Sequence, residues 1–225
     1  SHSLIYVSNT GSDDNTGLTV ETAKKTIAKA LETLDDEGTI IVLDTITENG
    51  IIINKNVTIS ASTNQIIDGN QGLIFNIANS QTVNLINLTL TNAKGSEGGA
   101  ILNNGTLNII GSILHDNLAT SDGGAIYNTG NLTINNSKLY NNNATSSKAY
   151  GGAICNDNGN VTVNGSEFYN NTGYYGGVIG SAGGNVYNPN CTVYINNSYF
   201  HNNNGTKTGG VIYNNYAYVS MVNSN

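Results

Sequence analysis

The repeated half of the chain contains five carboxylate side chains, which could act as acid or base catalysts: Glu97, Asp116, Asp122, Asp157 and Glu167. An inverting glycoside hydrolase needs two carboxyls that face one groove, about 6.5 to 9.5 Å apart. Relative to a serine that recurs in each repeat, Asp116 lies four residues after, Asp157 nine before and Glu167 one after, so no two of them share a position. Glu97 and Asp122 both precede a Gly-Gly pair and are expected to stack, but at a turn, where solvated acids are ordinary. We therefore predict that none of these five carboxylates is a catalytic residue.

A polar segment near the N-terminus, Asp-Asp-Asn-Thr-Gly at residues 13–17, carries oxygen atoms of the kind that bind calcium. A dedicated calcium loop has a longer spacing between its ligands and ends in a bidentate acid, which this segment lacks. We predict a polar turn here, and the sequence predicts no metal site and no cofactor.

Four aromatic residues favour a binding surface over a catalytic site. The residue after a recurring Leu or Phe is aromatic in four successive repeats, at His115, Tyr140, Tyr169 and His201. Because side chains alternate between the two faces of a strand, these rings are expected to form one outward column. Exposed rings stack on sugars or on partner side chains, but they also stabilise a sheet by cross-strand pairing. Both interpretations stay open, and the four residues are the candidate binding site.

A repeat positions these side chains. The run Ser-x-(Phe/Leu)-x-x-Asn occurs four times, beginning at Ser112, Ser137, Ser166 and Ser198. A run of Gly-Gly, a small residue and Ile brackets the copies, beginning at Gly98, Gly123, Gly151, Gly176 and Gly209. The spacing between copies is irregular, and the repeat is rich in β-forming residues. A repeat of this kind is typical of a stacked solenoid and not of a helical array.

Each repeat offers three short strands, for example residues 124–128, 131–135 and 137–141, which predicts a three-sided coil. Leu132 and Ile134 alternate with an outward Thr133, and equivalent apolar pairs recur in the neighbouring repeats. These residues should stack in interior columns about 4.8 Å apart, with the recurring Leu or Phe as a further column. The chirality of parallel crossovers makes the coil right-handed. We predict an all-β fold, a right-handed single-stranded parallel β-helix with three short strands per coil.

The asparagine that ends each repeat run has a structural interpretation. If its amide points inward at a corner, it can donate to and accept from the copies in the coils above and below. Such a ladder satisfies buried polar groups without a metal or water.

The N-terminal part differs from the rest. Apolar residues at Ile27, Ala30, Leu31 and Leu34 form one stripe of a helix over residues 26–34. We interpret residues 1–38 as an N-terminal strand and an α-helical cap, and residues 39–225 as the β-helix. By the repeat alignment the chain stops in the middle of a coil, so we expect the native protein to continue.

The composition excludes two classes of ligand. The chain has 225 residues, of which 41 are Asn and 27 Gly, and its eight basic residues are all Lys. A net charge of −7 without a basic run argues against nucleic acid and against an anionic membrane. No stretch reaches the roughly 18 apolar residues of a membrane-spanning helix. We expect a monomer with no membrane insertion in these residues.

Cys155 and Cys191 are the two cysteines, and the repeat places them on different strands of neighbouring coils. A disulfide needs Cα atoms within about 7 Å, which this offset does not favour. Two free, half-buried thiols are the preferred interpretation, and a disulfide remains the alternative.

The motifs carry a resemblance. Gly-Gly-Ala-Ile combined with Phe-x-x-Asn resembles the repeat of the chlamydial polymorphic outer-membrane proteins. The segments at residues 5–8, 26–31 and 87–90 are similar to the large adhesin-like surface proteins of methanogenic archaea. These families imply a right-handed β-helix of the pectate-lyase-like superfamily, displayed outside the cell on its surface. Val178 and Val211 depart from the pattern, which has Ala there, and these volume changes are tolerable.

The resemblance implies a non-enzymatic, adhesin-like cell-surface protein, a β-helical display scaffold for carbohydrate or protein on another cell. Two alternatives remain. One is a polysaccharide-active enzyme, a lyase or glycoside hydrolase; β-helical lyases commonly use an Arg base, and this chain has no Arg. The other is a passive surface stalk.

Overall fold

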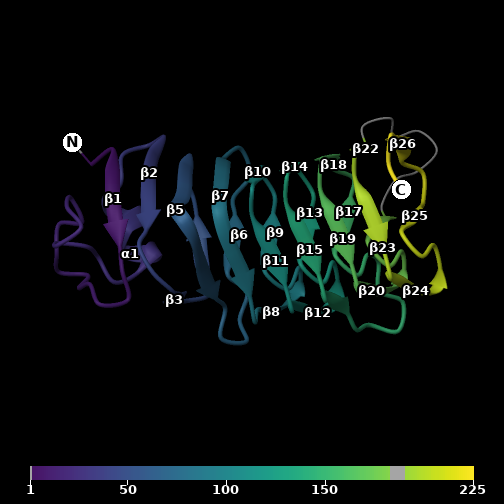
Figure 1. The fold of residues 1–225 in the computed structure, drawn as a ribbon, viewed down its shortest axis with the longest axis horizontal. Coiled ribbons are helices and arrows are strands. Elements are labelled where there is room, and N and C mark those ends of the chain that lie inside the picture. The colour runs from purple at the N-terminus through teal and green to yellow at the C-terminus, as the bar shows by residue number, and fades with distance from the viewer. Residues whose placement is uncertain (1, 183–190) are drawn as a thin grey trace.

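The computed structural model describes residues 2–182 and 191–225, which form an all-β parallel solenoid (Figure 1). The strands of the described residues assemble into three sheets of 14, 7 and 5 strands, which we call sheets A, B and C. All pairings between the named strands are parallel, because each strand pairs with its equivalent in the next coil. The predicted fold class and its three-sided coil are confirmed.

The strand bounds follow the repeat. Sheet A contains β1 (Leu4–Val7), β2 (Gly38–Val42), β3 (Ile46–Thr47), β5 (Val57–Asp68), β7 (Thr82–Thr91), β10 (Thr106–Ile110), β11 (Ile113–His115), β14 (Asn131–Asn135), β15 (Lys138–Tyr140), β18 (Asn160–Asn164), β19 (Glu167–Tyr169), β22 (Thr192–Asn196), β23 (Tyr199–His201) and β26 (Tyr218–Val222). Sheet B contains β4 (Ile51–Ile53), β6 (Phe75–Ile77), β9 (Ile101–Asn103), β13 (Ile126–Asn128), β17 (Ile154–Asp157), β21 (Ile179–Ala182) and β25 (Ile212–Asn214). Sheet C contains β8 (Lys94–Glu97), β12 (Leu118–Asp122), β16 (Asn143–Ala144), β20 (Thr172–Tyr175) and β24 (Asn204–Thr208).

The strands are distributed over the three sides of the coil differently from the prediction. Strands β14 and β15, expected on separate sides, both belong to sheet A, and the third side is sheet C, whose strands begin just after the repeat asparagine. Between β14 and β15 the chain passes through Asn136 in a left-handed conformation (φ 51°). Asn136 bends the chain, but both strands stay in sheet A. In the earlier coils β5 and β7 run through the equivalent position as single continuous strands.

The interior consists of the predicted columns. Leu139 pairs with Phe168, and Phe168 with Phe200, in exact lateral register of parallel strands. The two phenyl rings stack with centroids 4.9 Å apart and planes 7° from parallel. The aliphatic pairs stack in the same way, so that Leu132 follows Leu107 along the axis, and the equivalent residues continue through later coils. One cluster of buried side chains runs from the first coil to Phe200.

The predicted asparagine ladder is present at the corner between sheets A and C. The Nδ2 of Asn117 donates to Asn142 Oδ1 (3.1 Å), Asn142 to Asn171 (3.0 Å) and Asn171 to Asn203 (3.0 Å). The backbone N–H of each residue also donates to the amide oxygen of the next coil, and each Nδ2 reaches a backbone carbonyl. The hydrogen-bond donors and acceptors of these buried amides are therefore paired with one another, as expected for a buried corner.

Two further ladders escaped the sequence analysis. Asn103, Asn128 and Asn156 form a second buried amide ladder at the ends of sheet B strands, with Nδ2 to Oδ1 distances of 2.8 and 3.1 Å. The repeat serines form a third, in which the backbone N–H of Ser112 donates to Ser137 Oγ at 3.0 Å, and so on along the axis. A recurring Asn two residues after the Gly-Gly-x-Ile isoleucine was the available signal.

The Gly-Gly pairs have a steric cause. The first glycine of each pair adopts a positive φ, for example 68° at Gly123. A Cβ on the second glycine, Gly124, would lie 2.1 Å from the carbonyl oxygen of Gly152 in the next coil. This corner stacks so closely that only glycine fits.

The predicted N-terminal helix is present. Helix α1 (Ile27–Thr33) buries Ile27, Ala30 and Leu31 against the first strands, and Thr26 caps its N-terminus. Figure 1 shows α1 beside β1 and β2 at the purple end. The backbone N–H groups of Ile27 and Ala28 donate to the Glu48 carboxylate at 2.8 and 2.9 Å. The segment before α1 hydrogen-bonds to β1, since Tyr6 N–H donates to Gly17 O, so this edge is covered.

Cys155 and Cys191 are both free thiols, as the preferred interpretation of the sequence held. They are fully buried, however, and not half-buried as expected. Burial raises the pKa of both thiols. The stacked coils cover them more completely than strand alternation alone suggests. In the described part of the chain, no helix has the length and apolar character needed to cross a bilayer.

Candidate binding surface

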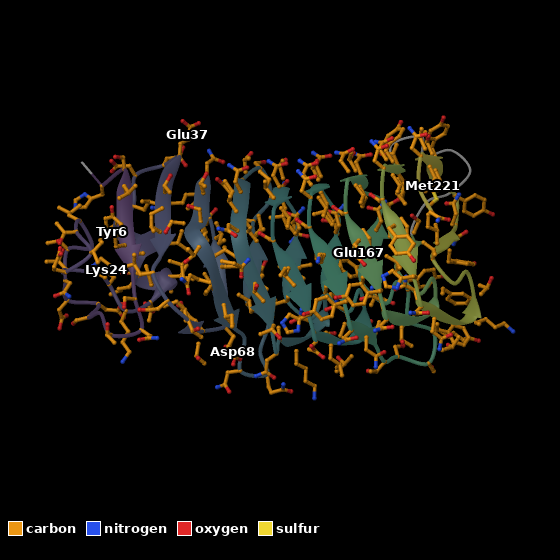
Figure 2. All side chains as sticks on the ribbon, in the orientation of Figure 1. Tyr6, Lys24, Glu37, Asp68, Glu167 and Met221 are labelled. Carbon is orange, nitrogen blue, oxygen red and sulfur yellow. The ribbon has the colours of Figure 1, made fainter. Side chains whose placement is uncertain are left out.

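The four predicted site residues lie in one outward column of sheet A. Strands β11, β15, β19 and β23 pair in parallel, and this register aligns their last residues. We call this column the aromatic ladder; it consists of His115, Tyr140, Tyr169 and His201. All four side chains are half-buried, and the face that carries them is turned to the viewer near the labelled Glu167 in Figure 2.

The rings of the ladder stack face to face. Successive centroids are 4.8, 4.7 and 4.9 Å apart, with planes 6°, 6° and 13° from parallel. The spacing matches the separation of neighbouring strands, so the backbone dictates it. Because each inner ring covers its neighbours, the faces of Tyr140 and Tyr169 are occupied within the ladder. The ladder therefore presents ring edges, with phenol hydroxyls and imidazole nitrogens, and these edges suit hydrogen bonding better than sugar stacking.

Charged groups flank both ends of the ladder. His115 Nδ1 lies 2.5 Å from Asp116 Oδ2, and His201 Nε2 lies 2.8 Å from Glu167 Oε1. Burial, followed by the nearby Asp116, raises the pKa of Tyr140; burial, Tyr140 and Glu167 raise that of Tyr169. Both phenols therefore stay protonated at neutral pH and keep their hydrogen-bond donors.

A groove of about 400 Å³ runs beside the ladder where sheet A bends. Its lining includes three corner residues and three outward residues of the ladder strands: Asn136, Gly165, Asn197, Lys138, Glu167 and Tyr199. This groove was not predicted from the sequence, because the repeat pattern places the two sides of the bend in different sheets. The available signal was the Asn or Gly directly before each repeat serine.

The carboxylates considered for catalysis have structural partners. Asp157 accepts a hydrogen bond from the Tyr127 hydroxyl at 2.6 Å, and burial followed by this bond raises the pKa of Tyr127. Asp122 accepts from the backbone N–H of Tyr150 at 2.7 Å. Glu97 pairs with Asp122 in register, so these two acids stack as expected. The two hydrogen bonds, to Asp157 and to Asp122, tie neighbouring coils together.

The N-terminal polar segment also uses its acid internally. Asp13 Oδ1 accepts hydrogen bonds from the backbone N–H groups of Lys25 and Thr26, and from the Thr26 hydroxyl. This carboxylate thus holds the start of α1. Within residues 2–182 and 191–225, no group of three or more His, Cys, Asp or Glu side chains is placed to bind a metal ion.

Comparison with known proteins finds one family match, and it lies in the repeat. Residues 111–129, which run from the bend before β11 to the end of β13, match the Chlamydia polymorphic membrane protein repeat. A solved structure of a rhamnogalacturonan lyase aligns with 88% of this chain and 73% of its own, at 13% identity and a TM-score of 0.44. A resemblance of this size says nothing about activity. No curated protein sequence is significantly similar to the chain.

Proposed function

We propose that this chain is the β-solenoid scaffold of an extracellular, cell-surface protein with a non-enzymatic, adhesin-like role. The match to a polymorphic membrane protein repeat supports a surface location. The scaffold presents the face of the aromatic ladder to carbohydrate or protein on another cell. The observation that carries this role is the ladder itself, a straight row of outward polar ring edges spaced 4.7 to 4.9 Å apart.

The geometry suits an extended partner more than a small substrate. The ladder repeats one kind of contact along the solenoid axis, so a partner with many similar groups can contact several rungs at once. Each additional rung contributes without a separate loss of translational freedom, which raises avidity. A single enclosed cavity would instead favour one compact ligand.

The test uses beads coated with the chain, mixed with a panel of archaeal, bacterial and mammalian cells. The double variant Tyr140→Phe, Tyr169→Phe keeps the stacked rings and removes the two hydroxyls. Two lost hydrogen bonds of about 1 kcal/mol each predict roughly tenfold or greater weakening of adhesion. The matched control is Tyr194→Phe, Tyr218→Phe, which changes two exposed tyrosines of sheet A outside the ladder.

Two results would contradict this proposal. Equal adhesion of the ladder variant and the control variant would remove the ladder from the contact surface. Release of unsaturated or reducing ends from polysaccharides incubated with the purified chain would contradict the non-enzymatic role.

A further inference from the structure

We infer that the groove beside the aromatic ladder is a binding site for a neutral oligosaccharide. This inference rests on the proposed function and names a ligand class and a place for it. The groove has about 400 Å³, within the usual range of ligand sites, and lies on the same face as the ladder.

Tyr199 supplies an aromatic platform that the ladder lacks. It stacks on His201 with centroids 4.6 Å apart and planes 24° from parallel, yet its side chain remains 48% exposed. In its own column Tyr199 follows Glu167, a carboxylate and not a ring. The ring therefore keeps open surface toward the groove, and the apolar C–H face of a sugar can pack on it.

The charged pair of the groove keeps hydrogen-bonding capacity. Lys138 Nζ lies 4.0 Å from Glu167 Oε2, beyond hydrogen-bond distance, so the ammonium donors are available to a ligand. Glu167 Oε1 is held by His201 Nε2 at 2.8 Å, which orients the carboxylate and leaves Oε2 free to accept. A donor and an acceptor this close match two adjacent hydroxyls of a sugar.

The corner residues add amide groups. Asn136 and Asn197 occupy the bend with φ values of 51° and 50°, and both side chains are exposed. Between them lies Gly165, where a Cβ would approach Asn136 Oδ1 to 2.7 Å. Glycine at this place keeps the floor open. Side-chain amides both donate and accept, as sugar hydroxyls do.

The charges favour an uncharged ligand. Within the groove the charge of the Lys138 ammonium is balanced by that of the Glu167 carboxylate, and the whole chain has a net charge of −7. A polyanionic glycan is repelled by the net charge. A neutral sugar gains the stacking and the hydrogen bonds without that repulsion.

The experiment is isothermal titration calorimetry of the purified chain with neutral trisaccharides of glucose, mannose, galactose and N-acetylglucosamine, and with trigalacturonic acid. We expect binding of at least one neutral trisaccharide and weaker binding of the acid. Tyr199→Ala should reduce that affinity about fivefold or more, because the platform is lost. Lys138→Met should also weaken binding. The control Tyr218→Ala removes a 61% exposed tyrosine outside the groove and should leave the affinity unchanged.

The outcomes separate this inference from the proposed function. Absence of binding by every neutral trisaccharide, or equal affinity of Tyr199→Ala and the unaltered chain, overturns the groove site. If cell adhesion is then still reduced by Tyr140→Phe, Tyr169→Phe, the adhesive face stands without the groove. Preferential binding of trigalacturonic acid overturns the assignment to neutral sugars.

Discussion

Replacing Asn142 by Ala is expected to be among the most destabilising single substitutions in the chain. The side chain is fully buried, and its Nδ2 donates to Leu114 O at 3.1 Å and to Asn171 Oδ1 at 3.0 Å. Its Oδ1 accepts from both the backbone N–H and the Nδ2 of Asn117, at 3.2 and 3.1 Å. Alanine removes all four interactions.

The magnitude follows from what remains unsatisfied. The backbone N–H of Asn117 becomes a buried donor without its partner, which costs about 1–3 kcal/mol. The Nδ2 of Asn117 still donates to Leu90 O at 3.2 Å. Asn171 Oδ1 still accepts a hydrogen bond from the backbone N–H of residue 142. Allowing about 1 kcal/mol for each weakened group gives a total loss of about 3–5 kcal/mol.

The measurement is urea unfolding followed by far-UV circular dichroism. With a slope of about 2–3 kcal/mol per molar urea, the midpoint should fall by about 1–2.5 M. The matched control is Asn143→Ala, since the Asn143 side chain is half-buried and hydrogen-bonds to no described residue. That variant should change the free energy of unfolding by about 0.5 kcal/mol or less. Equal losses for the two variants would refute the reasoning that the corner ladder stabilises the coils.

Three further predictions use the same unfolding assay. Gly124→Ala should lower the midpoint strongly because its Cβ would meet a carbonyl 2.1 Å away, whereas Gly111→Asn, with nothing within 4 Å, should be nearly neutral; similar midpoints would contradict this. Phe168→Ala should cost about 3–5 kcal/mol by leaving a cavity, and Phe168→Leu less than about 1.5, since Leu occupies the same column elsewhere; the reverse order would argue against the column. Burial raises the pKa of Glu48, so the folded state binds its proton more tightly and stability falls as pH rises through that pKa. The stability of Glu48→Gln relative to the unaltered chain should therefore rise as the pH increases through the raised pKa, and a difference that does not change with pH would oppose the assignment.

The columns were predictable because identical residue types recur at fixed offsets from one serine. Once the strands pair in parallel, the offsets alone place Leu139 next to Phe168 and Tyr140 next to Tyr169. Inward and outward positions then follow from strand alternation. The corner asparagines were predictable for the same reason, since an Asn recurs at the offset of Asn142 in four successive coils.

The bend of sheet A was not predictable from the repeat. A left-handed Asn or Gly is compatible both with a corner that separates two sheets and with a kink inside one sheet. Sheet C was missed because its strands are short and carry little apolar alternation, as in Asn143–Ala144. The groove depends on that bend, so it stayed hidden as well.

The mode of contact of the ladder also needed coordinates. The sequence indicates that rings lie in a column but not how each ring is rotated. The stacking of Tyr140 between His115 and Tyr169 leaves edges, not faces, for a partner.

If one side of the solenoid contacts another cell, a bulky group on that side should block adhesion and the same group elsewhere should not. Lys138→Cys and Lys148→Cys make the same change on the ladder face and in the loop after β16, while the native Cys155 and Cys191 are buried. Each variant is coupled to a bulky maleimide-polyethylene glycol, and adhesion of coated beads to cells is measured. We expect the label at position 138 to abolish adhesion and the label at position 148 to leave it intact. Equal adhesion of the two labelled chains would contradict it.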